Sequence, residues 1–295
     1  MMTADLDTQL TDFERTQVDA ARRWVLEEPS LSDRVLAGIG DRAQTALQRV
    51  LASERVAAAI EDATTQVLRR LDDQLLSGLD DDAALPTPAT PQQRSEVLRR
   101  ANERAEEVRR NHTRRLAAQS AVAGAASVNL LAAVVAVATD VSIVVRGGLR
   151  AAAHTLNVFG TPASHPALIA AAVEIAAAAG VTDSQRRRTA LVGAVHYLTN
   201  DEHPAAAQAD LRRMIAQQTG TRAITETLEQ VVRRAVQRRT LRVIPFLGGA
   251  ASVATSWHVG GRICDAAAHA GRLAYLTRHT GLPPSNWFHQ QNTRQ

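Results

Sequence analysis

The chain has 295 residues, which is enough for one large or two ordinary domains with a substantial core. Its formal net charge of +4 is mild and does not commit it to nucleic acid, although every basic residue is an arginine. Cys264 is the single cysteine, which excludes a disulfide framework and a cysteine-based metal site. The first 20 residues carry several acids and lack a basic-then-apolar signal pattern, so we expect a cytoplasmic protein.

The composition favours helices over sheet. Aromatic residues make up only 3% of the chain, while alanine is abundant throughout. The mean hydropathy of −0.16 argues against a polytopic membrane protein. Alternation of apolar and polar residues with a period of two, which would indicate strands, is absent. The sequence therefore predicts an all-α fold, a multi-helix bundle around an Ala/Gly-rich apolar central helix pair.

The first third of the chain predicts amphipathic helices and then a linker. Residues 10–28 form a candidate opening helix, and residues 42–76 keep apolar side chains at spacings of three and four. Residues 80–92 hold three consecutive Asp and three Pro, a composition that cannot build a core. This linker divides the chain into four parts: N-terminal amphipathic helices (1–79), the linker (80–92), a helical core (93–285) and a flexible tail (286–295).

An uncharged segment lies at the centre of the chain. Residues 94–116 predict a charged helix that feeds directly into it, and no charged side chain occurs between Arg115 and Asp140. A segment that is apolar all round belongs in a protein core or against a membrane. Asp140 and several polar residues make residues 116–145 a poor membrane span. We favour a buried central helix or hairpin, with membrane insertion as the alternative.

Further helices are predicted toward the C-terminus. The apolar residues 167–180 predict a core helix, and Thr182 and Asp183 offer a cap for a helix that ends near residue 200. Residues 204–241 suggest two more amphipathic helices, and a closing helix that ends at Gly281 follows them. Because this closing helix and the central segment are both rich in small residues, we expect them to pack together.

Three stretches resemble one protein family. RRWVLEEPS at residues 22–30 has a Trp followed by a Pro about five positions on. The central apolar segment is followed by Asp140, a further apolar helix and the pair Phe159-Gly160. Residues 242–276 have a Pro, a Gly-rich turn and a closing helix. In this order the chain resembles the EcsC family of bacterial proteins. The resemblance implies an α-helical protein, sometimes encoded beside a transporter, with no established reaction.

Four residues are candidates for an enzyme site: Asp140, His258, Asp265 and His269. Asp140 interrupts an apolar segment, so it needs an ion-pair partner, a helix N-cap position, or a role in a site. His258, Asp265 and His269 fall on one helix face, where Asp265 and His269 could orient each other. A metal needs a further ligand from another helix, so we predict no metal and no cofactor. A solvated or ion-paired helix face is the simpler interpretation. The alternative is a hydrolase-type enzyme with an Asp/His pocket, with or without a metal.

Arginine clusters flank the two apolar stretches. They are typical of attraction to an anionic membrane surface, although a solvated helix face balanced by nearby Glu explains them too. Nucleic acid is less favoured because aromatic stacking platforms are absent. We therefore expect a non-enzymatic helical protein that is peripheral on the inner membrane, bound to anionic lipid or a membrane protein, of undetermined oligomeric state. The predicted contact residues are Arg109, Arg110, Arg114, Arg115, Arg233, Arg234, Arg238, Arg239 and Arg242.

Overall fold

The computed structural model describes residues 9–27, 79, 84–125, 147–165, 167–180, 183–199 and 248–293. All regular secondary structure in these ranges is helical, which confirms the all-α prediction. The predicted helices over residues 42–76 and 204–241 lie outside the described residues, and so does most of the central apolar segment.

The described helices match several predicted boundaries. The charged helix runs without a break into the first part of the apolar segment, and the closing helix ends at residue 280 just before Gly281, whose φ is +70°. A helical stretch over residues 147–158 precedes the turn at Gly160. The elements are α2 (Asp12–Leu26), α6 (Pro91–Ala125), α8 (Leu168–Gly180), α9 (Ser184–Thr199), α12 (Gly248–Thr280) and the 3-10 helix η1 (Pro284–Thr293).

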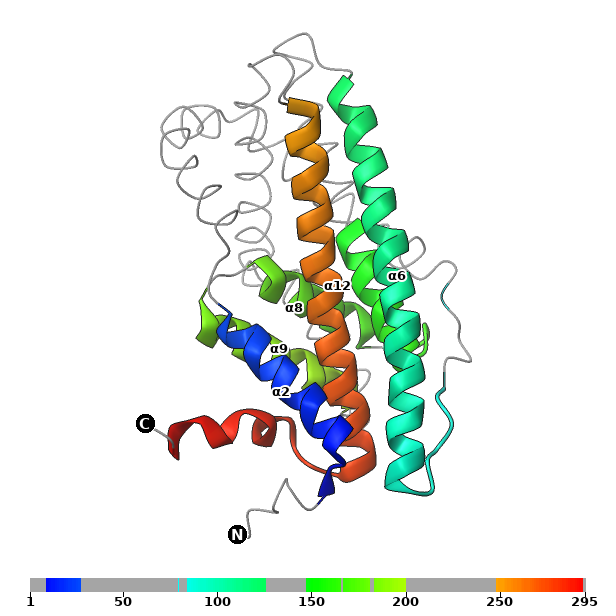
Figure 1. The fold of residues 1–295 in the computed structure, drawn as a ribbon, viewed down its shortest axis with the longest axis vertical. Helices are drawn as coiled ribbons and strands as arrows, with labels where there is room; N and C mark the ends of the chain where they lie inside the picture. Colours follow the sequence, from blue (N-terminus) through cyan, green and yellow to red (C-terminus); the bar gives the residue numbers. More distant parts are fainter. Residues whose placement is uncertain are drawn as a thin grey trace.

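Helix α12 lies at the centre of the described bundle. It runs antiparallel to α6 as a long pair, while α2, α8 and α9 cross this pair at an angle (Figure 1). It also contacts η1, so it touches each of the other five elements. Alanine and glycine together occupy more than half of its described buried positions, which lets neighbouring helices approach closely. The alanines with no exposed surface are Ala266, Ala267, Ala270 and Ala274.

Glycines mark the closest contacts of α12. A Cβ atom added at Gly260 would lie 2.7 Å from Leu116 Cδ1 of α6. One added at Gly271 would lie 2.7 Å from Cγ of the fully buried Phe159. The closing helix therefore packs against Leu116, at the beginning of the central segment, and against the turn that follows residues 147–158. The predicted contact between the small residues of the two segments falls mostly outside the described residues.

Local signals explain where the helices begin. Thr11 and Glu14 form a capping box at the start of α2, in which each side chain bonds the other residue's backbone N–H. The Thr90 hydroxyl accepts from the Gln93 backbone N–H at the start of α6. Asp183 Oδ1 accepts from the Arg186 N–H at 2.7 Å, so Asp183 caps α9 as predicted.

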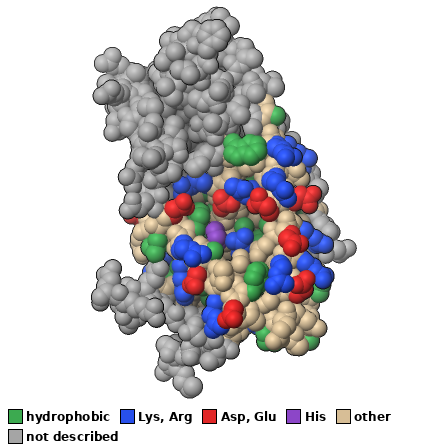
Figure 2. Space-filling model, viewed as in Figure 1, with side chains coloured by type: hydrophobic (Ala, Val, Ile, Leu, Met, Phe, Trp, Pro, Cys, Tyr) green, Lys and Arg blue, Asp and Glu red, His purple; other side chains and the backbone are tan. Residues whose placement is uncertain are grey.

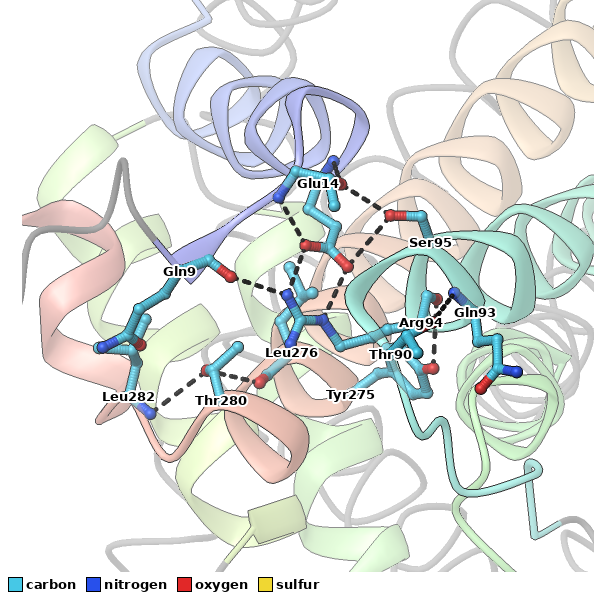
Figure 3. Close-up of polar contacts among 11 residues, drawn as sticks. Gln9, Glu14, Thr90, Gln93, Arg94, Ser95, Tyr275, Leu276, Thr280 and Leu282 are labelled. Carbon is cyan, nitrogen blue, oxygen red and sulfur yellow. Dashed lines mark hydrogen bonds and ion pairs between the residues drawn. The ribbon is translucent and has the colours of Figure 1, made fainter.

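A buried ion pair connects α2 to α6. Glu14 is fully buried, and its two carboxylate oxygens accept from Nε and NH2 of Arg94 at 2.7 and 2.8 Å. Arg94 also donates to the Gln9 carbonyl, and its own carbonyl accepts from the Tyr275 hydroxyl of α12 (Figure 3). Bidentate geometry with further hydrogen bonds is the arrangement in which buried charges are compensated.

A second buried arginine holds the other end of α2. Arg187 of α9 is 2% exposed, and its guanidinium donates to the carbonyls of Trp24 and Glu27 at 2.8 and 2.6 Å. These carbonyls lack partners within the helix because they belong to its C-terminal end. The positive charge also lies at the negative end of the helix dipole. Arg187 therefore fixes α9 against α2.

Two segments that were predicted to lie outside the core contact it in the structure. Residues 286–295 were expected to form a flexible tail, yet they begin within η1, where Trp287 and Phe288 are 0% and 4% exposed. In the linker, Leu85 packs against the core beside Gly160. The apolar side chains of these two segments contact the core because other helices supply the apolar surface on which they pack.

We predict opposite effects of two Gly→Ala changes. Gly271→Ala should destabilise the fold by about 1–3 kcal/mol, because the new methyl group overlaps Phe159. Gly193→Ala in α9 should stabilise it by about 0.5–1 kcal/mol, because a Cβ there meets nothing within 4 Å and alanine favours helix. Urea unfolding of both variants measures these changes in the free energy of unfolding. Equal stability of the two would contradict the packing of α12.

Glu14→Gln should cost about 3–5 kcal/mol, because the buried Arg94 then lacks its counter-charge. Glutamine can still complete the capping box, so the loss reports the ion pair. The matched control is Glu96→Gln, which breaks exposed pairs with Arg99 and Arg100 and should cost at most about 1 kcal/mol. Thermal melts compare the variants, and a double change with Arg94→Met should recover part of the loss.

Candidate functional site

Asp265 of α12 forms an ion pair with α6. Its Oδ1 lies 2.9 Å from Nε of Arg109, whose NH1 also lies 3.3 Å from Oε1 of Glu106. Burial raises the pKa of Asp265, and the positive charge of Arg109 opposes that shift. The two side chains are 40% and 35% exposed, so this is a partly solvated bridge between helices.

His269 lies one turn further along α12, in a different environment. Its ring is 8% exposed and lies against Trp24 of α2, with the ring centroids 5.7 Å apart. Nδ1 is 3.3 Å from NH1 of Arg272. Burial and the charge of Arg272 lower the pKa of His269 to about 3, so the imidazole is neutral at physiological pH. His269 therefore serves as a packed core residue.

A chain of hydrogen bonds joins three helices beside His269. Arg272 Nε donates to Asn102 Oδ1 of α6 at 2.6 Å, and Asn102 Nδ2 donates to Gln17 Oε1 of α2 at 3.3 Å. Burial lowers the pKa of Arg272 from its usual value. Sequence analysis missed Asn102 and Gln17, because neither belongs to a motif and only the fold brings them together.

The four predicted enzyme residues do not form a described site. Asp140 lies outside the described residues, and so does the side chain of His258, although residue 258 belongs to α12. Asp265 and His269 share no hydrogen bond; each contacts other partners. In the described part of the chain, no three His, Cys, Asp or Glu residues gather to hold a metal. Burial raises the pKa of Cys264 to about 12, so its thiol is not a nucleophile at neutral pH.

Two histidines form a cluster that sequence analysis missed. His112 of α6 and His154 of residues 147–158 contact edge to face, with ring centroids 5.0 Å apart. Burial is the main cause that lowers the pKa of each to about 4, and the charges of Arg115 and Arg150 contribute. Two imidazoles do not complete a metal site. Nothing in the sequence pairs residues 42 positions apart, so only the fold identifies them.

The predicted basic contact residues have different surroundings. Arg109 is paired as described above, and Arg110 Nε donates to the Glu106 carbonyl at 3.4 Å. Arg114 and Arg115 are exposed and form no ion pair with any described residue. The second cluster lies outside the described residues: Arg233, Arg234, Arg238, Arg239 and Arg242.

Charge is distributed unevenly along the α6–α12 pair. Residues 91–108 of α6 carry four Arg and four Glu, whereas residues 109–125 carry four Arg and no acid. In the antiparallel partner, residues 248–264 carry Arg262 and no acid. Both signs mix over most of the described face, and at its upper edge a large hydrophobic side chain lies beside basic ones (Figure 2). We call residues 109–125 and 248–264 the basic end of the pair.

Comparisons and hydropathy add two findings. No protein-family model, curated protein or solved structure matches the chain. The resemblance to the EcsC family therefore stays a prediction, and the class the structure defines is an all-α helical bundle. Within the described ranges, none of the helices combines the length and the apolar character needed to span a bilayer.

The buried histidines predict loss of stability in acid. Their folded pKa values, about 4 for His112 and His154 and about 3 for His269, lie below the value of about 6.5 expected in the unfolded chain. The unfolded state therefore takes up more protons below pH 6.5, and stability decreases as the pH falls toward 4. The raised pKa values of Asp265 and Glu174 act in the opposite direction.

A comparison of variants isolates the histidine contribution. His154→Gln should make the stability less dependent on pH between 6.5 and 4 than it is in the parent protein. His112→Gln should weaken the pH dependence in the same way, because burial lowers the pKa of His112 to about 4 as well. Urea unfolding at half-unit pH steps measures the slopes. Identical slopes for His154→Gln and the parent would contradict a neutral, buried His154.

Proposed function

We propose that the chain is a non-enzymatic, cytoplasmic helical protein that associates peripherally with the inner face of a membrane through its basic end. The observation that carries the proposal is the charge asymmetry of the α6–α12 pair: the basic end has five Arg and no acid, while the rest of α6 is balanced. The apolar residues 126–139 follow this end in the sequence, and Arg233–Arg242 precede the start of α12.

The physical basis is attraction between guanidinium groups and anionic lipid. Each Arg near an anionic leaflet contributes about 1 kcal/mol, and the attraction falls off within a Debye length, about 8 Å at physiological salt. Exposed arginines without an acidic partner contribute most, because no ion pair has to be broken. Arg114 and Arg115 meet this condition among the described residues, whereas Arg109 is already paired with Asp265.

The contacts of the enzyme candidates support a non-enzymatic role. Asp265 joins α12 to α6, and His269 packs on Trp24. Both side chains are therefore engaged in holding helices together. The EcsC resemblance agrees with this proposal, since it implies a helical protein that is sometimes encoded beside a transporter.

Flotation on liposomes tests the proposal. The chain should float with vesicles that contain phosphatidylglycerol at low salt, and release should follow as the salt is raised. Changing Arg114 and Arg115 to Gln should lower the partition coefficient roughly 30-fold, because two contributions of about 1 kcal/mol are lost.

The matched control changes Arg99 and Arg100 to Gln. These arginines belong to the same helix, are more than half exposed and are paired with Glu96, so their loss should leave flotation nearly unchanged. Absence of binding at low salt would remove the lipid version of the proposal. Binding to native inner-membrane vesicles but not to pure lipid would instead indicate a membrane protein as the partner.

A further inference from the structure

One tryptophan differs from the other two in its exposure. Trp24 and Trp287 are 8% and 0% exposed, whereas Trp257 of α12 is 45% exposed. Leu26 is the other large hydrophobic side chain found exposed among the described residues, and it lies at the end of α2. An indole has an apolar ring system and a polar N–H group. A half-exposed indole on this Ala-rich helix therefore matches a binding partner that offers both apolar and polar contacts.

Trp257 lies at the basic end of the α6–α12 pair. Helical spacing puts it one turn before Gly261 and two turns before Asp265, on the same side of α12. Both of these residues lie beside Arg109 of α6. Gly260 faces Leu116, which follows Arg115 directly. The indole is therefore next to the part of α6 that carries the exposed arginines without ion pairs.

Trp257 stays 45% exposed although the two helices pack closely one turn away, where a Cβ atom added at Gly260 would lie 2.7 Å from Leu116 Cδ1. The exposed indole and the exposed Arg114 and Arg115, which pair with no acid among the described residues, thus occur at the same end of the helix pair. Membrane interfaces attract both, since Trp is enriched at headgroup level and anionic headgroups attract Arg.

We infer that Trp257 inserts into the headgroup region of an anionic phospholipid bilayer while Arg114 and Arg115 bind the lipid phosphates. This inference rests on the proposed function and names both its lipid partner and its contact residue. At about 1.5 Å per residue, the Glu14–Arg94 end stands about 30 Å from the contact.

The three tryptophans lie at different distances from the proposed lipid contact. Trp24 lies beside His269, about 18 Å along α12 from Trp257. The Trp287 indole donates to the Thr277 hydroxyl, about 30 Å along the same helix. Both are also buried in the bundle. Only Trp257 should therefore sense lipid, which makes the intrinsic fluorescence of the full chain a specific probe.

The experiment adds phosphatidylglycerol/phosphatidylcholine vesicles to the full chain, with and without brominated acyl chains. The emission of the parent protein should shift to shorter wavelength and be partly quenched by the brominated lipid. Trp257→Phe should float but show neither change, since the two remaining tryptophans stay in the bundle. Trp257→Ser should lower the partition coefficient roughly tenfold or more, because the apolar contact is lost.

The outcomes separate this inference from the proposed function. Flotation of the parent without a shift or quenching would overturn the role of Trp257 and leave peripheral binding intact. A shift that persists in Trp257→Phe would overturn it too, because another tryptophan would then contact lipid. Failure of the parent to float on anionic vesicles would overturn lipid binding itself. Near-UV circular dichroism of each variant confirms that the fold is retained.

Discussion

The close packing around α12 is the constraint on which the rest of the described structure depends. This helix contacts α2, α6, α8, α9 and η1, which are all the other described elements. Alanine and glycine occupy more than half of its described buried positions, and Gly260 and Gly271 meet Leu116 and Phe159 at distances that leave no room for a methyl group. Helices packed at such short distances gain dispersion contacts that large side chains would prevent. The scarcity of aromatic residues in the chain agrees with this mode of packing.

Buried arginines then fix the orientation of the shorter helices. Arg94 holds the beginning of α2 through Glu14, and Arg187 holds its end through backbone carbonyls. Arg272 connects α12 to Asn102 in the middle of α6. Each of these arginines bonds to a neighbouring helix, because its side chain is long enough to reach that helix and its planar guanidinium can donate several hydrogen bonds. The abundance of arginine in this part of the chain thus serves structure as well as surface charge.

The candidate site shows what periodicity can and cannot reveal. Helical spacing correctly put Asp265 and His269 on one long helix, but it could not tell that Arg109 and Trp24 would be their neighbours. In the structure Asp265 pairs with Arg109 of α6, while the ring of His269 packs against Trp24 of α2. The pair of His112 and His154 had no signal at all, since the residues belong to different elements. In contrast, the exposed Arg114 and Arg115 were predicted from local charge alone.

The sequence by itself determined the helical class, the cap at Asp183 and the C-terminal end of α12, because composition, capping residues and glycine breaks act over a few neighbouring positions. Only the tertiary structure decided that α12 is the central helix, that Glu14 and Arg94 form a buried pair, and that the basic end carries an exposed Trp257. Burial and pairing depend on which helices meet. Side chains 80 positions apart in the sequence leave no periodic trace of such a contact.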